Sequence, residues 1–320
     1  GLPQDDSRAL LKIVDEHLIV AVNALYQQGA QLKHVIIDGG RSRLGRTKKG
    51  EGALLQFGGF ADSGYLVRGQ VVEFVKAYEP RGWSTLVIDG SQDALDVGCS
   101  EALISNNEFG PAGHSDDGTW ADGISLACAK SVVSNNLIID ATDGGIVIFG
   151  APGSLIVNNT IRAETRLMLG GIIMVDYAYH GDYTNTRVIG NTIDARGAPI
   201  RIGLAMGARA WGGCLDPDSP ESRLRNRGGI VQENVLRGKH MMYGFLVNGV
   251  EDWTVLDNRD EATHSGTPLR KCGEQIPAHP SGFQMNGATS SGRFQEEFQE
   301  AFVDGALVAI LSPDNYWWDD

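Results

Sequence analysis

Two aspartates, Asp122 and Asp143, lie 21 residues apart, and each is followed directly by glycine and an apolar run. If the two apolar runs form neighbouring strands, both carboxylates lie on one outer face, a few ångströms from each other. A pair of carboxylates on either side of a glycosidic bond can act as general acid and general base. The spacing therefore predicts acid/base chemistry on a sugar, with a structural turn as the alternative because Asp-Gly is a common turn dipeptide.

Further polar and aromatic residues are expected near this pair. His114 precedes Asp122 in a polar segment, and Asp176 follows about one strand repeat after Asp143, so either can assist the pair. Aromatic rings and arginines can hold a saccharide by stacking and hydrogen bonding. Ordinary packing is the alternative for each of them. The candidate substrate-binding residues are Arg81, Trp83, Trp120, Tyr177, Arg201 and Trp211.

The sequence carries no established metal or nucleotide signature. It has no His-Glu-x-x-His motif, no cysteine cluster with zinc spacing and no EF-hand loop. Calcium at Asp116, Asp117 and Asp122 is the one metal alternative. No glycine-rich phosphate loop and no Gly-x-Ser-x-Gly elbow is present. We therefore expect neither a metal nor a cofactor.

A recurring unit, a short β-branched segment that ends in asparagine, must position these residues. The repeat asparagines are Asn107, Asn136, Asn159, Asn191, Asn234 and Asn258. Their spacings are 29, 23, 32, 43 and 24 residues. Such a period is typical of a solenoid, in which each turn of the coil, or rung, stacks on the next. The pattern predicts an all-β, right-handed parallel β-helix with asparagines stacked at one corner and loops inserted at others.

The cysteines support this register. Cys99 and Cys128 each lie eight residues before a repeat asparagine, so we expect them on successive rungs with Cα atoms about 5 Å apart. That separation permits a disulfide, and two buried thiols are the alternative. Cys214 and Cys272 form a second, looser candidate pair. Four cysteines that can pair fit an oxidising compartment.

Composition excludes several classes of protein. The 320 residues include 42 glycines, which fits tight corners between short strands. The formal net charge of −13 opposes binding to nucleic acid and to anionic membranes. No apolar run of about 18 residues exists, and no signal peptide is visible, as if upstream residues had been removed. We expect a secreted monomer that binds an oligo- or polysaccharide.

We expect one domain over residues 1–320, with regular rungs over about 30–260 and C-terminal loops with a capping helix over 261–320. Residues 9–37 are expected to form strands rather than helices, because later rungs need earlier strands to pair with. The basic segment 41–52 is expected to be a solvated loop.

The C-terminal helix is expected because Ser290 and Ser291 can cap a helix that carries apolar residues on one face. These are Phe294, Phe298, Ala301 and Phe302. Such a helix can cover the open edge of the coil.

The asparagine-ended rungs, with the segments Trp120–Ile124 and Asp143–Gly150, resemble the pectin-lyase-like right-handed β-helix superfamily, in particular its secreted fungal members. The resemblance covers residues 30–260 approximately. Within that superfamily, polygalacturonase-like hydrolases carry Asn-Thr-Asp-Gly, an Asp-Asp about one rung later, then Gly-His-Gly and Arg-Ile-Lys. Asp122 matches the first motif and Asp143 the second by spacing. Thr142 replaces the paired aspartate, Gly-His-Gly is missing, and the segment from Arg201 lacks the final lysine.

The resemblance implies a carbohydrate-active enzyme, and the carboxylate pair favours a glycoside hydrolase. A polysaccharide lyase is the second hypothesis, although Lys and Arg, which can serve as its base, are sparse on the central rungs. A non-catalytic glycan-binding β-helix is the third, in which the aspartates only shape corners. A likeness of fold alone cannot choose among these reactions.

Overall fold

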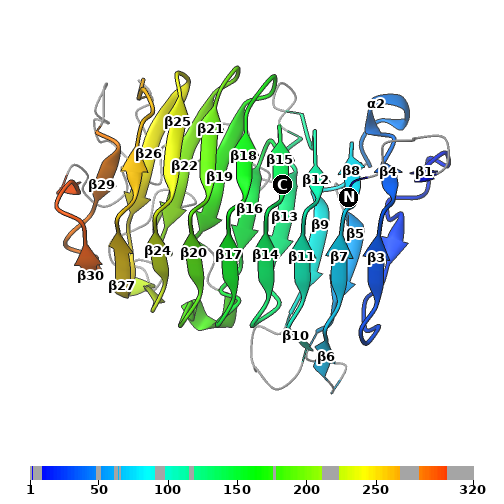
Figure 1. Ribbon diagram of the computed structural model, residues 1–320, viewed down its shortest axis with the longest axis horizontal. Helices are drawn as coiled ribbons and strands as arrows, with labels where there is room; N and C mark the ends of the chain where they lie inside the picture. Colours follow the sequence, from blue (N-terminus) through cyan, green and yellow to red (C-terminus); the bar gives the residue numbers. More distant parts are fainter. Residues whose placement is uncertain are drawn as a thin grey trace.

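The computed structural model describes residues 2, 9–47, 52–60, 64, 66–90, 98–114, 119–175, 178–210, 223–266 and 281–300. Its strands coil into three long sheets in which the described strand pairs are all parallel, and the rungs stack side by side along the molecule (Figure 1). In each complete rung the chain passes through sheet C, then sheet A, then sheet B. The predicted parallel β-helix is confirmed.

The three sheets are defined by their strands. Sheet A contains β1 (Leu10–Lys12), β4 (Ile36–Asp38), β8 (Lys76–Tyr78), β12 (Glu108–Phe109), β15 (Leu137–Ile139), β18 (Thr160–Arg162), β21 (Thr192–Ala195), β25 (Val235–Gly238) and β28 (Arg259–Asp260). Sheet B contains β2 (Val22–Asn23), β5 (Ala53–Gly58), β9 (Ser84–Asp89), β13 (Asp122–Leu126), β16 (Gly144–Ile148), β19 (Met168–Met174), β22 (Ile200–Met206), β26 (Met241–Val247), β29 (Phe283–Met285) and β31 (Gln299–Glu300).

Sheet C contains β3 (Gln31–Lys33), β7 (Val71–Glu73), β11 (Leu103–Ser105), β14 (Val132–Ser134), β17 (Leu155–Val157), β20 (Arg187–Ile189), β24 (Ile230–Gln232), β27 (Val250–Leu256), β23 (Asn226–Arg227) and β30 (Ser290–Phe294). A separate short pair joins β6 (Leu66–Arg68) to β10 (Gly98–Ser100). The short helices are α2 (Arg41–Leu44) and the 3₁₀ turn η2 (Ala178–Gly181).

The interior is a continuous apolar core. Most strands of sheets A and C have three residues, and the middle one points inward, as Ile138, Ile161 and Ile193 do on successive rungs of sheet A. Each of these side chains is fully buried. Strands of a parallel sheet are covered on both faces. The inward positions of each rung are therefore filled by apolar residues, many of them β-branched.

The corner between sheets C and A holds the asparagine ladder. Asn159 Oδ1 accepts hydrogen bonds from the backbone N and side-chain Nδ2 of Asn136, and Asn191 does the same for Asn159. The arrangement continues through every rung from Asn107 to Asn258. The predicted equivalence of the repeat asparagines is confirmed, because they lie along one side of the coil.

The residue before each ladder position adopts the left-handed backbone conformation. Its φ angle lies between 53° and 63° on eight successive rungs. Asparagine and glycine tolerate this conformation better than other residues do. The eight residues are His34, Phe74, Asn106, Asn135, Asn158, Gly190, Glu233 and Asp257.

The expected C-terminal helix is wrong for the described residues. Residues 290–294 form β30, which pairs with β27, and Gln299–Glu300 form β31. Gln295 takes the next ladder position, since its Oε1 accepts from Asn258 N at 3.0 Å and its Nε2 donates to Asn258 O at 3.1 Å. A further rung satisfies backbone groups that a helix would leave open. Residues 301–320 lie outside the described part.

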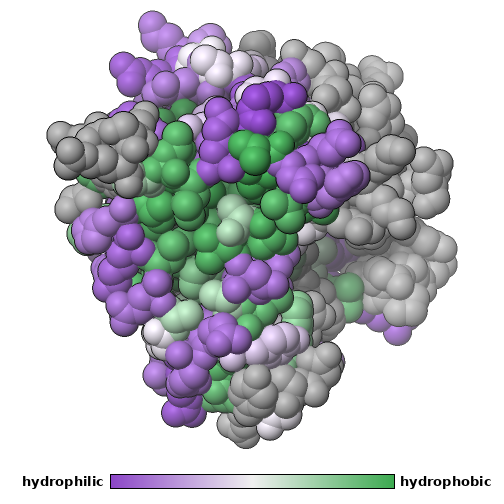
Figure 2. Space-filling model, turned by 90° about the vertical axis from the view of Figure 1, so that its right-hand side faces the viewer, coloured by the Kyte–Doolittle hydropathy of each residue, from purple (hydrophilic) through white to green (hydrophobic). Residues whose placement is uncertain are grey.

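The strands expected in residues 9–37 are present as β1 to β4. They form the N-terminal end of the coil, which shows hydrophobic residues at its centre (Figure 2). Leu10, Leu11, Val14 and Leu18 are exposed there. The coil therefore starts well before the first repeat asparagine. The asparagine repeat does not mark the first two rungs, since valines occupy the equivalent corner positions there.

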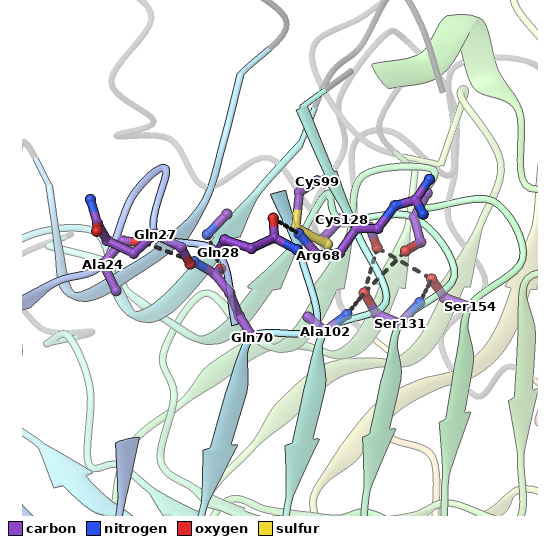
Figure 3. The surroundings of a disulfide bond; sticks show 12 residues. Ala24, Gln27, Gln28, Arg68, Gln70, Cys99, Ala102, Cys128, Ser131 and Ser154 are labelled. Carbon is purple, nitrogen blue, oxygen red and sulfur yellow. Dashed lines mark hydrogen bonds between the residues drawn. A yellow bond between two sulfur atoms is a disulfide. The ribbon is translucent and has the colours of Figure 1, made fainter. Parts of the chain in front are cut away.

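Cys99 and Cys128 form a disulfide with Cα atoms 4.8 Å apart, as the register predicts. The bond joins neighbouring rungs at the corner between sheets B and C (Figure 3). Ser131 Oγ donates to Cys128 O at 2.9 Å and accepts from Ala102 N at 3.2 Å, which fixes the backbone beside the disulfide. Cys214 and Cys272 lie outside the described residues.

Candidate active site

The aspartate pair lies at the corner between sheets A and B, where the sheet B strands begin. Asp122 is the first residue of β13, and Asp143 immediately precedes β16. Parallel pairing aligns Ile124 with Ile146, so Asp122 is level with Gly144. Asp143 is level with Ala121, and its backbone N donates to Ala121 O at 3.1 Å. The pair thus occupies neighbouring rungs, displaced by one residue along the strand.

Asp122 is hydrogen-bonded within sheet B and only 4% exposed. Its Oδ2 accepts from Ser125 Oγ at 2.7 Å, and its Oδ1 accepts from Gly144 N at 3.1 Å. Ser125 Oγ lies 2.8 Å from Ser84 Oγ on β9. We expected a carboxylate on the outer face that a sugar can reach, and the burial of Asp122 contradicts this accessibility. Its carboxylate instead fixes the backbone directly after Asp143.

The three-residue spacing of Asp122 and Ser125 depends on Gly123. A Cβ added to Gly123 would lie 2.6 Å from Ile138 Cγ2, so Gly123 faces the interior of the coil. Ile124 also belongs to the interior core. Two consecutive inward residues break the alternation of the strand, which brings Asp122 and Ser125 to the same outer face. Sequence reasoning missed Ser125 because strict alternation places residues two apart, not three apart, on one face.

Asp143 is the more accessible member of the pair, and it is half-buried. It precedes the same close approach, because a Cβ on Gly145 would lie 2.6 Å from Ile161 Cγ2. Its carbonyl accepts from Gly170 N at 2.9 Å, so the next rung fixes its backbone as well. The glycines after both aspartates thus serve close packing between sheets A and B, not a tight turn alone.

Arg201 is level with Asp143 in sheet B. The pairings of β16 with β19 and of β19 with β22 make Asp143, Leu169 and Arg201 level on three successive rungs. Two rungs separate Arg201 from Asp143, or roughly 10 Å. Arg201 is half-buried.

The centre of the outer face of sheet B is apolar and buried. Its residues form a second hydrophobic cluster outside the coil, consisting of Val147, Ile173, Val175, Ile202, Ala205, Ala210, Tyr243 and Leu246. The polar residues Ser84, Asp122 and Ser125 stand beside this cluster on earlier rungs. The apolar outer face of sheet B thus covers the rungs from β16 to β26, and the polar residues around Asp122 lie on the rungs before it.

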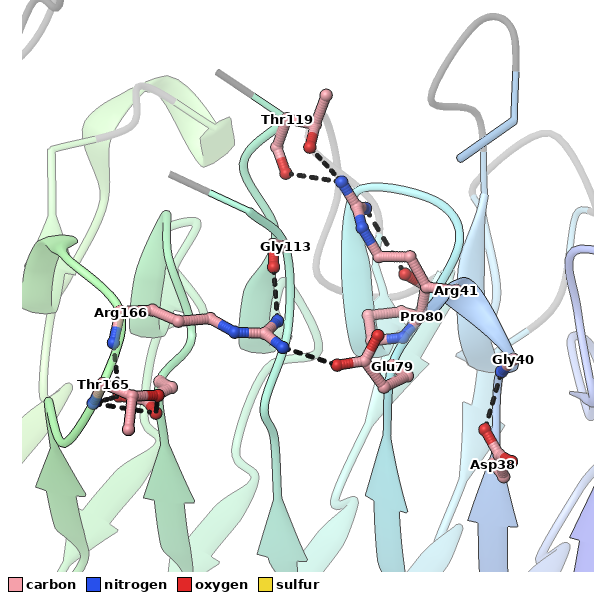
Figure 4. Close-up of polar contacts among 10 residues, drawn as sticks. Asp38, Gly40, Arg41, Glu79, Pro80, Gly113, Thr119, Thr165 and Arg166 are labelled. Atoms are coloured by element: carbon pink, nitrogen blue, oxygen red, sulfur yellow. Dashed lines mark hydrogen bonds and ion pairs between the residues drawn. The ribbon is translucent and has the colours of Figure 1, made fainter. Parts of the chain in front are cut away.

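The loop that carries His114 is held by Arg166 (Figure 4). Arg166 Nη1 donates to Gly113 O at 2.6 Å, and its Nη2 contacts Glu79 Oε1 at 2.7 Å. Asp140 accepts from the backbone N of Arg166 at 3.2 Å and thereby fixes the turn from which Arg166 extends. The His114 side chain is exposed. One arginine thus ties three corner loops of sheets A and B together.

Arg41 does not belong to a solvated loop, contrary to our expectation for segment 41–52. It is 7% exposed and forms the first residue of α2. Its Nη2 donates to Thr119 O at 3.2 Å and to Thr119 Oγ1, and its Nη1 donates to Pro80 O at 3.5 Å (Figure 4). A guanidinium has five donors, so one buried arginine can join loops from three rungs.

The predicted aromatic residues differ in accessibility. Trp120 is 7% exposed and belongs to the packing of the corner, so its ring is not an open platform. Trp83 is 37% exposed, and its carbonyl accepts from Asp122 N at 2.9 Å. Among the described aromatic residues beside the pair, Trp83 is therefore the one that a ligand can reach. Asp176, Tyr177 and Trp211 lie outside the described residues.

Arg81 is 4% exposed, and carbonyl groups hold its guanidinium. Its Nε donates to Gly45 O at 2.9 Å, and its Nη1 donates to Glu16 O at 2.7 Å and to Leu18 O at 2.9 Å. Arg81 lies three residues before Ser84, at the same sheet edge as Asp122 and two rungs from Asp143.

A further carboxyl group, Asp89, lies at the opposite edge of sheet B, where β9 ends. Burial raises its pKa to about 6. Gly58 pairs with it on the preceding rung. Five residues of extended strand separate its position from that of Asp122, or roughly 16 Å, so the two carboxyls cannot act on one bond. The dipeptide Asp89-Gly90 repeats the Asp-Gly pattern of the predicted pair. This repeat is the sequence signal from which Asp89 could have been found.

No cluster of three or more potential metal-binding side chains occurs in the part of the chain that the structure describes. The calcium alternative rests partly on Asp116 and Asp117, which lie outside that part. None of the described helices has the length and hydrophobicity needed to traverse a bilayer.

Comparison with known proteins identifies the fold. The family described as "right handed beta helix region" matches residues 84–207. The solved catalytic domain of a GH87 alpha-1,3-glucanase in complex with nigerose is 13% identical, with a TM-score of 0.40. The alignment covers 85% of this chain and 55% of that one. A variant of a GH87 alpha-1,3-glucanase catalytic domain in complex with tetrasaccharides is 12% identical, with a TM-score of 0.29, 87% of this chain and 55% of that one being covered.

This chain thus spans about half the length of those two structures. No curated protein matches the sequence. The match over residues 84–207 includes Asp122, Asp143 and Arg201, and it agrees with the stacked parallel strands of sheets A, B and C. The chain is a right-handed parallel β-helix.

Proposed function

We propose that this protein is a carbohydrate-active enzyme, a glycoside hydrolase that binds its glycan along the sheet B edge formed by Arg81, Trp83, Asp122 and Asp143. The observation that carries the proposal is the pair of carboxylates on neighbouring rungs, with an accessible tryptophan beside them. The disulfide fits a secreted protein, and we propose an extracellular location.

The two aspartates differ in accessibility, and we assign them different roles for that reason. Asp143 is half-buried, so it is the carboxyl group that meets the substrate and exchanges a proton with the glycosidic oxygen or with water. Asp122 is the second carboxylate, and its bond to Gly144 N orients the backbone next to Asp143. His114 and Asp176 remain candidates for assisting residues. Arg201, level with Asp143, is a candidate for binding sugar hydroxyls on the later rungs.

A non-catalytic glycan-binding β-helix is the second candidate. The observation that favours it is the burial of Asp122, whose two oxygens both accept hydrogen bonds from the protein, as a purely structural aspartate would. A polysaccharide lyase is the third, and its products differ from those of a hydrolase.

The test is activity on a panel of neutral and acidic glycans that includes alpha-1,3-glucan and polygalacturonate. New reducing ends without unsaturated uronate absorbance indicate hydrolysis, that absorbance indicates a lyase, and binding without either product indicates a binding protein. On the best substrate, Asp143→Asn is expected to lose about 10²–10⁴-fold in kcat/KM, the usual contribution of proton transfer.

Asp122→Asn is expected to lose activity and keep the fold, because an amide oxygen can still accept from Gly144 N and Ser125 can reverse its hydroxyl. Asp257→Asn is the matched control, since it makes the same chemical change at an exposed corner of sheets C and A. Wild-type rates in both the Asp122 and Asp143 variants would reject this pair as catalytic.

A further inference from the structure

A depression with a volume of about 590 Å³ lies at the N-terminal end of the proposed binding edge. It is lined by Glu16, His17, Ile19, Leu44, Arg46, Thr47 and Arg81. Two of these residues are arginines and one is a glutamate. The depression is thus more cationic than the protein as a whole, whose net charge is −13.

Arg81 supplies a preorganised donor to this depression. Nε and Nη1 of its guanidinium are occupied by backbone carbonyls of residues 15, 16, 18 and 45. Within the described part of the chain, Nη2 has no acceptor, and no carboxylate forms an ion pair with Arg81. Arg81 is only 4% exposed. A buried cation that is hydrogen-bonded only to carbonyl oxygens is stabilised by a nearby anion.

We propose that this depression binds an oxyanion carried by a saccharide, either the carboxylate of an acidic sugar or a sulfate ester. Arg81 Nη2 donates to the anion, Arg46 adds a second positive charge, and Thr47 lines the wall beside them. Glu16 opposes binding by repulsion. That the anion is attached to a saccharide rests on the proposed function, whereas the anion site rests on Arg81 and its neighbours.

The position of the depression suits a substituent on a bound glycan. Arg81 precedes β9, and β9 is followed on sheet B by β13 and β16, which carry the aspartate pair. The lining residues precede β2, β5 and β9, so the depression lies two to four rungs from β16, or roughly 10–20 Å, which is about two to four sugar units. The anion would therefore belong to a sugar a few units from the cleaved bond, and the enzyme would prefer acidic oligosaccharides.

Arg81 also ties two loops together, so its removal can unfold this edge. The test therefore uses Glu16→Gln and Arg46→Gln, with calorimetric titration of glucuronate, glucose 6-sulfate and glucose. Glu261→Gln and Arg237→Gln are matched controls, because they make the same charge changes in an exposed ion pair on the last rungs of sheet A.

We expect at least one of the two acidic sugars to bind at least tenfold more tightly than glucose, and the tighter of the two identifies the anion. Glu16→Gln is expected to tighten that binding about threefold and Arg46→Gln to weaken it about threefold, since a unit charge at the edge of a site is only partly screened. The control variants are expected to match the wild type. Equal affinity for glucose and both acidic sugars, or no difference between site and control variants, would overturn the proposal.

The failure of this proposal can be distinguished from failure of the proposed function. Asp143→Asn is expected to bind the acidic sugar as the wild type does. Anion binding without cleavage of any glycan would keep the anion site and reject the hydrolase. Cleavage of neutral glycans without any anion binding would reject the anion site and keep the hydrolase.

Discussion

The side-chain oxygen of Asn191 accepts two hydrogen bonds from Asn159, one from the backbone N and one from Nδ2, both at 2.9 Å. Asn191 Nδ2 in turn donates to Ile156 O at 3.0 Å and to Asn234 Oδ1 at 2.9 Å. One buried side chain thus satisfies polar groups on the rungs before and after it. Removing it leaves several buried groups without partners.

Asn191→Ala is therefore expected to lower the free energy of unfolding by about 3–5 kcal/mol, because each unsatisfied buried group costs about 1–3 kcal/mol. Denaturant unfolding measures the change. Asn107→Ala is the comparison, since Asn107 begins the ladder and its predecessor at this corner is Val75. A loss at Asn191 no larger than the loss at Asn107 would mean that the ladder does not act as a continuous network.

The corner before the ladder also predicts a stabilising substitution. Glu233 has a φ of 57°, whereas three other rungs place asparagine at the equivalent position, with φ between 54° and 57°. Glu233→Asn is expected to raise the free energy of unfolding by about 0.5–1 kcal/mol, because asparagine adopts the left-handed conformation at a lower cost in free energy than glutamate does. The reciprocal change, Asn135→Glu, is expected to lower it by a similar amount. Opposite signs for the two variants would contradict the backbone argument.

The Cys99–Cys128 disulfide closes a loop of 29 residues between neighbouring rungs. In the chain-entropy description, a loop of this length corresponds to about 3–4 kcal/mol of stabilisation. Replacing both cysteines by alanine is expected to lower the midpoint of denaturant unfolding accordingly. Adding a reductant should shift the wild type toward the variant and leave the variant unchanged. A wild type whose midpoint does not respond to complete reduction would refute the prediction.

The sequence was sufficient for the rungs and for the disulfide because both follow from one visible period. Each repeat asparagine marks the same corner, so the offset of Cys99 and Cys128 from it determined their separation. The same reasoning failed at the ends of the coil. The first rungs carry valine at the ladder position and the last carries Gln295, so the rungs there lack the marker.

The candidate site was less predictable because it depends on burial. The sequence placed Asp122 and Asp143 on neighbouring rungs, but it did not show that Asp122 is enclosed and bonded to Gly144. That difference arises from Gly123, whose inward position brings Ser125 to the face of Asp122, and from Gly144 on the next rung, neither of which strict strand alternation predicts. Asp89 was missed for a related reason. Only its surroundings distinguish it from an ordinary Asp-Gly corner.

The buried carboxyl of Asp89 predicts a specific pH dependence. Burial raises its pKa from 3.8 to about 6, so the folded protein binds this proton more tightly than the unfolded chain does. The stabilising contribution of the protonated form is fully present below about pH 4 and is lost as the pH rises through about 6. A shift of this size corresponds to at most about 3 kcal/mol.

Asp89→Asn cannot ionise, so it is expected to gain stability relative to the wild type as the pH is raised from about 4 to 7.5. The measurement is the difference in unfolding free energy between variant and wild type at each pH, which cancels the titration of the other groups. Asp257→Asn provides the same chemical change at an exposed corner. A difference for Asp89→Asn that stays flat across this range, or follows that of Asp257→Asn, would show that Asp89 is solvated in the folded protein.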